Sequence, residues 1–88
     1  MYKVVLDKKV LKDLKKIDKK EQIKIIDTIE NKLTNDPFIG KKLMGNLSEF
    51  YKYRVGNYRI IYSIFQEIVE IEIIKIGHRK DVYEKWVF

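Results

Sequence analysis

The sequence predicts a small α+β fold in the order β-α-α-β-β-β, in which an N-terminal helical hairpin packs on one face of an antiparallel sheet. Two observations lead to this prediction. Apolar residues recur at helical spacing between residues 10 and 33, whereas they alternate with polar residues from residue 50 onward. The dipeptide Gly56-Asn57 interrupts the alternating region, and it is a two-residue turn typical of a β-hairpin.

The N-terminal part begins with a short apolar run at residues 2–6, and two predicted helices follow it. Asp7 offers an N-cap to the first helix. The apolar stripe of this helix consists of Val10, Leu11, Leu14 and Ile17. Asp18 and Glu21 resemble a capping box that opens the second helix. Its predicted buried face consists of Ile23, Ile26, Ile29 and Leu33, with Ile25 at its flank. Pro37 ends the helix, because proline disfavours the helical conformation in the residue before it.

A loop over residues 38–48 is predicted to lead into a three-stranded meander over residues 50–55, 58–65 and 68–76. Side-chain alternation divides the hairpin into an apolar face and a cationic face. The apolar face, on which the helices are expected to pack, consists of Tyr51, Tyr53, Val55, Tyr58, Ile60 and Tyr62. The turn Gln66-Glu67 contains neither glycine nor asparagine, so the register of the last strand stays open.

Composition limits the class of protein. A chain of 88 residues is expected to form a single domain over residues 1–88. The absence of cysteine excludes disulfides, and we expect a cytoplasmic protein with neither a signal peptide nor a membrane span. One histidine and scattered carboxylates do not suggest a metal site, and no cofactor is expected. The net charge of +6 favours a polyanion or an acidic protein as the partner.

The cationic face of the hairpin carries the clearest functional signal. If Gly56-Asn57 is the turn, Arg54 falls opposite Arg59, and Lys52 lies on the same face. Like charges directly opposite each other destabilise a strand pair by up to about 1 kcal/mol, so this arrangement suggests an anionic ligand such as phosphate. We expect the helices to leave this face open. A lysine-rich chain can also place cations on a solvated face by chance, and that alternative stays open here.

A basic face of this kind would bind phosphate, or it would cleave RNA without a metal by activating the ribose 2′-hydroxyl against the adjacent phosphorus. The candidate cations are Lys52, Arg54, Arg59 and Arg79. A lysine acts as a base only where neighbouring cations favour its neutral form. Tyr83 would stack on a base or donate a hydrogen bond to a phosphate. His78, the sole histidine, is a further acid–base candidate, although a lone histidine is more often an ordinary surface residue.

These residues resemble the RelE branch of the RelE/ParE toxin superfamily over nearly the entire chain. The resemblance rests on the segment LMGNL at residues 43–47, the hairpin YKYRVGNYRIIY that follows it, and the segment IKIGHRKDVY. It implies an mRNA endonuclease that enters the ribosomal A site and cuts the message. It also implies an antitoxin, encoded beside the toxin, that holds it inactive, commonly in a hetero-oligomer.

The resemblance also implies a role for each site residue. Lys52 matches a lysine proposed as the general base, and Arg54 lies where a second basic residue stabilises the transition state. Arg59 matches a phosphate-binding arginine, and Arg79 matches an arginine near the leaving group. Tyr83 matches a tyrosine that orients the nucleotide or stacks on it. One departure is Arg54 itself, because lysine also occurs there and the two cations bind phosphate with different geometry.

Alternatives remain for the base and for the activity. Some relatives use a histidine with a carboxylate, so either Lys52 or His78 would take the first proton. A ParE-like protein that poisons DNA gyrase would share the fold, so the fold alone does not decide. A degenerate toxin that only binds its antitoxin is a third possibility. The nuclease is favoured over both by the intact set Lys52, Arg54, Arg59, Arg79 and Tyr83.

Overall fold

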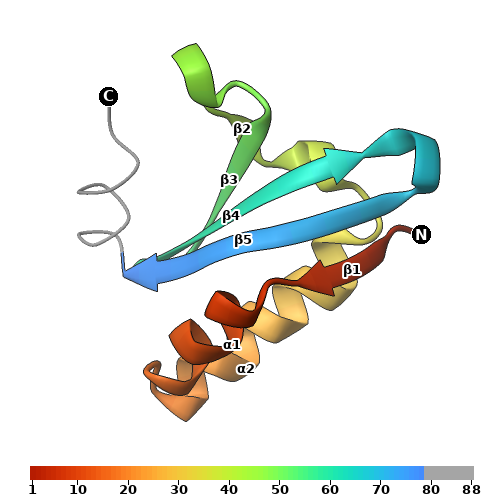
Figure 1. Cartoon of the computed structure of the whole chain (residues 1–88). Helices are drawn as coiled ribbons and strands as arrows, with labels where there is room; N and C mark the ends of the chain where they lie inside the picture. The colour runs from red at the N-terminus through yellow and green to blue at the C-terminus, as the bar shows by residue number, and fades with distance from the viewer. Residues whose placement is uncertain (79–88) are drawn as a thin grey trace.

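The computed structural model describes residues 1–78, which form a five-stranded sheet with two helices against one face (Figure 1). The strands are β1 (Lys3–Leu6), β2 (Lys41–Lys42), β3 (Phe50–Val55), β4 (Tyr58–Phe65) and β5 (Glu70–His78). Their order in the sheet is β1-β5-β4-β3-β2. The helices are α1 (Lys8–Lys15) and α2 (Lys19–Thr28), and a π-helical turn over Ile29–Leu33 continues α2. Three 3-10 turns span Pro37–Ile39, Gly45–Leu47 and Gln66–Ile68.

The predicted α+β fold and its antiparallel meander are confirmed. β3 and β4 pair with Arg54 opposite Arg59, which is the register that the Gly56-Asn57 turn predicts. Gly56 has a φ of 59°, a conformation that glycine adopts without strain. The structure adds that β1 pairs with β5 in parallel, so the first strand of the chain extends the meander at its far edge. A sequence pattern could not reveal this pairing, because the two strands are separated by most of the chain.

The first helix largely agrees with its predicted pattern. The Asp7 carboxylate accepts a hydrogen bond from the backbone N–H of Lys9 at 3.0 Å, so Asp7 is the N-cap. The buried members of the predicted stripe are Val10, Leu14 and Ile17. Leu11 is half-exposed, so its place in the stripe is wrong. In the described part of the chain, no helix combines the length and the apolar character needed to span a membrane.

The connection between the two helices differs from the predicted capping box. Asp18 precedes α2, but its side chain makes no capping hydrogen bond. The side-chain amide of Gln22 instead reaches back to the end of α1, where it donates to the carbonyl oxygens of Leu14 at 2.5 Å and Ile17 at 2.8 Å. This amide joins the first turn of α2 to the end of α1, and so ties the two helices together.

The buried face of α2 is rotated from the predicted one. Ile25, Ile29 and Leu33 are buried, whereas Ile23 is 61% exposed and Ile26 is 39% exposed. The isoleucines of this helix occupy more than one face, so helical spacing alone fits two adjacent stripes. The choice between them follows from how α2 lies on the sheet.

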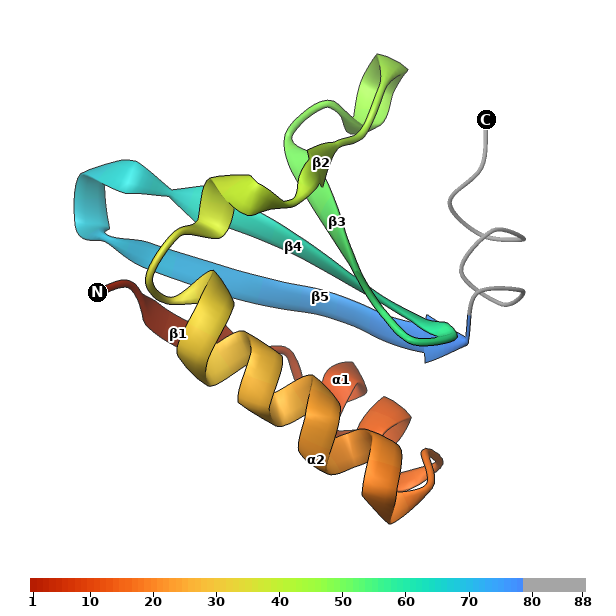
Figure 2. The ribbon, with the colours of Figure 1, turned by 180° about the vertical axis from the view of Figure 1, so that it is seen from behind.

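The helices cover the sheet face that the sequence predicts, with α1 packed mainly on β5 and α2 on β3 (Figures 1 and 2). The buried centre of this face consists of Ile60, Tyr62, Ile71, Ile73 and Ile76. On the opposite face, Arg59 is 5% exposed, Ile61 is 1% exposed and Ser63 is 8% exposed. The helices leave this face uncovered, as predicted, although its side chains on β4 are buried (Figure 1). β4 is the middle strand of the sheet, so neighbouring strands flank it on both sides.

The last strand exchanges its two faces midway. Lys75 lies opposite Ile61, whereas Ile73 lies opposite Tyr62, so Ile74 is one extra residue on β5. An extra residue of this kind is a β-bulge. Because side chains alternate with a period of two, the residues after the bulge point to the faces opposite those that strict alternation predicts.

The segment predicted as a loop over residues 38–48 contains the short strand β2. The Tyr62 hydroxyl donates a hydrogen bond to the Pro37 carbonyl oxygen at 2.8 Å, which anchors the start of this segment to β4. A Cβ atom at Gly40 would overlap the Tyr62 hydroxyl and would lie 2.8 Å from the Lys52 carbonyl oxygen. The absence of a side chain at Gly40 thus lets the segment approach β3, and Lys41 pairs opposite Lys52.

Candidate functional site

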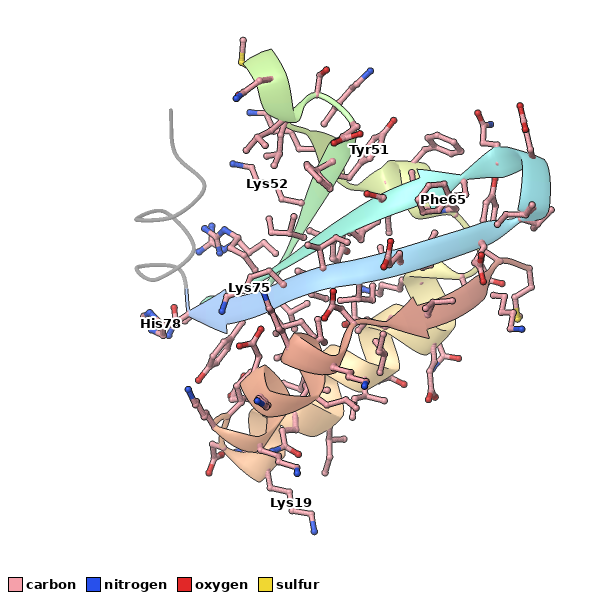
Figure 3. All side chains as sticks on the ribbon, viewed as in Figure 1. Lys19, Tyr51, Lys52, Phe65, Lys75 and His78 are labelled. Carbon is pink, nitrogen blue, oxygen red and sulfur yellow. The ribbon has the colours of Figure 1, made fainter. Side chains whose placement is uncertain are left out.

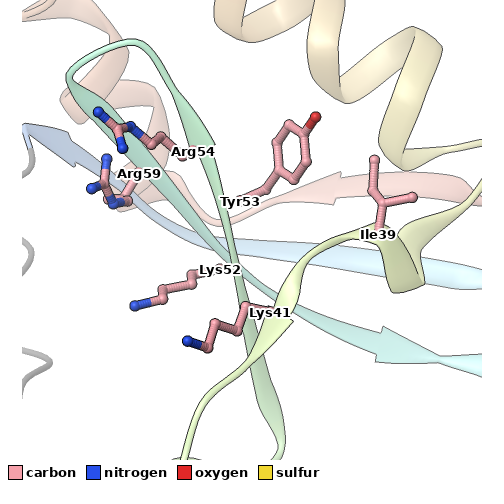
Figure 4. A pocket seen from close by; sticks show the side chains of 6 residues that line it. All are labelled: Ile39, Lys41, Lys52, Tyr53, Arg54 and Arg59. Atoms are coloured by element: carbon pink, nitrogen blue, oxygen red, sulfur yellow. The ribbon is translucent and has the colours of Figure 1, made fainter.

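Four cationic side chains gather on the sheet face opposite the helices (Figure 4). We call them the basic cluster, and its members are Lys41, Lys52, Arg54 and Arg59. The backbone register brings them together, because Lys41 lies opposite Lys52 and Arg54 lies opposite Arg59. Directly opposed side chains of antiparallel strands have Cβ atoms about 4.5–5.5 Å apart.

The basic cluster lines a pocket of about 430 Å³ together with Ile39 and Tyr53. None of the described residues that line this pocket is acidic. The four cations extend to one side of the hairpin, and Tyr53 extends to the other side (Figure 4). A pocket whose described lining includes four cations suits a multiply charged anion.

The two arginines of the cluster are held differently. Arg59 is buried, and its Nη1 donates to the carbonyl oxygen of Tyr58 at 3.4 Å. Arg54 is exposed, and its Nε donates to the carbonyl oxygen of Gly56 at 3.2 Å. A guanidinium has five donors, so the single bond to Gly56 leaves Arg54 able to bind a phosphate as well. One arginine therefore forms the floor of the site, and the other lies at its solvent side.

Lys52 occupies the centre of the cluster. It lies between Lys41 on β2 and Ile61 on β4, and Arg59 is diagonal to it across the hairpin. The structure thus brings together Lys52, Arg54 and Arg59, as the alternation of the hairpin predicts. Lys41 is the member that the sequence analysis missed, because nothing in residues 38–48 follows a strand pattern.

His78 lies on the other face of the sheet. It pairs opposite Tyr58, and the two rings meet edge to face with their centroids 5.6 Å apart. The β5 residue opposite Arg59 is Gly77, so glycine stands where β5 could have added a side chain to the cluster. Figure 3 shows His78 at the end of β5. The two remaining candidates, Arg79 and Tyr83, lie outside the described residues.

Lys75 on β5 shares the face of the basic cluster, since it lies opposite Ile61. Its Nζ is 3.0 Å from Oδ1 of Asp13 on α1, and both side chains are largely buried. Oδ2 of Asp13 accepts a hydrogen bond from the backbone N–H of Ile76 at 3.3 Å. Asp13 thus neutralises Lys75 and joins α1 to β5 beyond the end of β1. The sequence offers no signal for this contact, because the two residues are far apart in the chain.

Tyr62 supports the site from the helix side of the sheet. Burial raises the pKa of its phenol above the ordinary value of 10.0. The phenol therefore stays neutral and donates to the Pro37 carbonyl oxygen. Within residues 1–78, no group of three or more histidine or carboxylate side chains could hold a metal ion. The chemistry available to the described site is thus that of its cations.

The mixed sheet, the helical hairpin and the basic cluster agree with the fold and the cationic face that the resemblance to the RelE/ParE toxins predicts. A family model described as the ParE toxin of type II toxin-antitoxin system, parDE, matches residues 4–83. The chain belongs to this family. The resemblance predicted from the hairpin and from the segment after it is confirmed.

Individual relatives agree with this assignment. The chain is 29% identical over 83 residues to toxin RelE of Mycobacterium tuberculosis, covering 93% of this chain and 86% of the relative. It is also similar to the toxin–antitoxin complex RelBE2 of M. tuberculosis, with a TM-score of 0.84, 26% identity, and coverage of 89% of this chain and 98% of that one. The archaeal RelE–RelB complex from Pyrococcus horikoshii gives a TM-score of 0.68 and 30% identity, covering 89% of this chain and 94% of that one.

Proposed function

We propose that this toxin is an endoribonuclease that cleaves messenger RNA on the ribosome, without a metal, through attack of a ribose 2′-hydroxyl. The observation that carries the proposal is the basic cluster, in which two like-charged pairs lie side by side around one pocket. Opposed like charges destabilise a sheet, and a bound phosphodiester would offset that cost. The similarity to toxins named RelE supports the same activity.

In this proposal Lys52 takes the proton of the 2′-hydroxyl, and the 2′-oxygen attacks the adjacent phosphorus. Arg54 and Arg59 stabilise the negative charge that develops on the phosphorane oxygens. The bond to the 5′-oxygen then breaks and this oxygen takes up a proton from water, which leaves a 2′,3′-cyclic phosphate and a 5′-hydroxyl. The resemblance assigns Arg79 to the leaving oxygen and Tyr83 to the nucleotide. The first proton is assigned to Lys52 and not to His78, since His78 lies on the opposite face.

The proposal includes a cognate antitoxin in a hetero-oligomer with this toxin, and a site of action on ribosomes in the cytoplasm. The similar structures include a toxin–antitoxin complex and a RelE–RelB complex, which supports such a partner. An inhibitory segment would displace the turn predicted after residue 78 or cover the basic cluster. An antitoxin segment that binds there would supply carboxylates to Lys52 and Arg54 in place of phosphate.

The experiment is a translation reaction with a defined message, in which new RNA ends are mapped by primer extension. We expect cuts within the translated frame, and we expect them to disappear with Arg54→Ala and with Arg59→Ala. Arg54 is exposed, so its variant should remain folded even if replacement of the buried Arg59 disturbs the sheet. Lys42→Ala is the matched control, because it removes one charge from the other face of β2 and should leave cleavage intact.

Inhibition of DNA gyrase is the second candidate, and the description of the family model as a ParE toxin favours it. The same protein preparation is therefore added to a DNA supercoiling reaction. An intact message together with blocked supercoiling would replace the nuclease proposal with the gyrase one. An intact message with normal supercoiling would leave a toxin whose remaining role is antitoxin binding.

A further inference from the structure

Lys41 is a cation of the pocket that none of the proposed catalytic roles uses. It lies directly opposite Lys52, so the sheet contains a second like-charged pair next to the pair of Arg54 and Arg59. Lys41 is exposed, and among residues 1–78 it forms no ion pair. We infer that Lys41 binds the phosphate next to the scissile one along the RNA and so positions the substrate. This inference rests on the proposed function for the identity of its ligand.

The position of Lys41 in the sheet assigns it to a neighbouring phosphate. Arg59, Lys52 and Lys41 lie on three successive strands, β4, β3 and β2. Successive strands are about 4.8 Å apart, so Lys41 lies roughly 10 Å from the backbone of β4, on the far side of Lys52. A phosphate held between Arg54 and Arg59 is therefore nearer to Lys52 than to Lys41. An RNA backbone that crosses the strands passes Lys41 with its next phosphate.

The backbone of Lys41 is held in place from two sides. Its strand pairs with β3, and Gly40 packs against the Tyr62 hydroxyl and the Lys52 carbonyl oxygen. The Tyr62 hydroxyl in turn binds the Pro37 carbonyl oxygen. Figure 4 shows the side chains of Lys41 and Lys52 extending in the same direction. A cation fixed at its backbone loses less freedom on binding than one in an unanchored loop.

The charges on the sheet face that carries the basic cluster also indicate the direction in which the RNA backbone crosses the strands. Lys75 would extend the row of cations past β4 to β5, but the carboxylate of Asp13 lies 3.0 Å from Nζ of Lys75. That ion pair leaves little net charge for a phosphate. Lys41, on the β2 side, is exposed and has no carboxylate partner among residues 1–78. The RNA therefore runs from the arginine pair toward β2.

The inference is tested by binding of a short single-stranded 2′-O-methyl RNA, which cannot be cut because its 2′-oxygens are blocked. Affinity is measured by fluorescence anisotropy between about 50 and 200 mM salt. Each phosphate contact to a single strand contributes about 0.7 to the slope of log affinity against log salt. Lys41→Ala should lower the magnitude of this slope by about 0.7. Over this fourfold rise in salt, the factor by which the variant loses affinity should therefore be about 2.6 times smaller than the factor for the wild type. Lys41→Arg should restore the slope.

Lys42→Ala is the matched control, because Lys42 is the adjacent residue, is equally charged and exposed, and lies on the opposite face. An unchanged slope for Lys42→Ala supports the inference. Equal effects of the two variants, no effect of Lys41→Ala, or no measurable RNA binding by the wild type would each overturn it. It would also be overturned if Lys41→Ala weakened the binding of a polyglutamate peptide but not of RNA. If the slopes behave as expected while the translated message stays intact, the nuclease proposal fails and the phosphate contact stands.

Discussion

Replacement of Asp13 by alanine is expected to destabilise the fold strongly for a single polar residue. The Asp13 carboxylate has two partners on β5, the Lys75 ammonium at 3.0 Å and the Ile76 backbone N–H at 3.3 Å. β1 ends at Leu6, opposite Ile73. Beyond that point along the edge of β5, the Asp13 carboxylate accepts the backbone N–H of Ile76. Asp13→Ala therefore removes both the counter-charge of a cation and the acceptor of an edge N–H group.

The magnitude follows from the burial of the pair. The side chain of Asp13 is 15% exposed and that of Lys75 is 23% exposed. A surface ion pair contributes at most about 1 kcal/mol, whereas disruption of a buried one costs about 3–5 kcal/mol, and this pair lies between the two cases. We take about 1–2 kcal/mol for the lost counter-charge. An N–H group left without an acceptor adds roughly 1–2 kcal/mol. The expected loss in the free energy of unfolding is about 2–4 kcal/mol.

The assay is urea denaturation at neutral pH. Asp13→Asn keeps an oxygen for the N–H of Ile76 and should cost about half as much as Asp13→Ala, whereas Lys75→Met removes only the ion pair. The double variant Asp13→Asn with Lys75→Met gives the coupling energy of the pair. Asp27→Ala is the control, because Asp27 is an exposed helical aspartate, and its loss should cost less than about 0.5 kcal/mol. If Asp13→Ala costs no more than Asp27→Ala, Asp13 does not hold α1 to the sheet.

Two further substitutions test other features of the fold. Tyr62→Phe removes the donor to the Pro37 carbonyl oxygen and should cost about 1–2 kcal/mol at pH 8. Burial raises the pKa of Tyr62, so just above pH 10 the unfolded chain releases this proton and the folded chain keeps it. By about pH 11 the difference in free energy of unfolding between the wild type and Tyr62→Phe should therefore shrink by roughly 1.4 kcal/mol. An unchanged difference in urea denaturation would contradict this account. Val69 has a φ of 51°, which costs an L-residue about 1–2 kcal/mol, so Val69→Gly should stabilise the protein by about 0.5–1 kcal/mol after the entropic cost of glycine. Ile68→Gly is the control and should destabilise the protein. A Val69→Gly variant less stable than the wild type in the same assay would show that the turn is not strained.

The hairpin and most of the first helix could be predicted from the sequence because their determinants are local. Alternating side chains and the Gly56-Asn57 turn fix which residues are opposite each other, so the meeting of Arg54 with Arg59 followed without a structure. An N-cap and an apolar stripe define α1 in the same way. The family resemblance also depended on short segments and is confirmed.

The remaining members of the site depended on contacts between distant segments. β2 has two residues, which is too short for a periodic pattern, and a side chain at Gly40 would clash with Tyr62 and β3. Lys41 thus entered the basic cluster through packing that no local pattern records. The buried stripe of α2 was likewise selected by the sheet on which the helix lies, since its isoleucines allow two choices.

By itself, the sequence determined the α+β class, the hairpin register and the cationic trio Lys52, Arg54 and Arg59. Only the tertiary structure decided that β1 joins β5 in parallel, that Lys41 completes the pocket, and that His78 faces away from it. The physical reason is clearest in β5, where one extra residue exchanges the two faces of a strand. The alternation of side chains depends on the local backbone of the strand, whereas the position of a bulge depends on the strand with which it pairs.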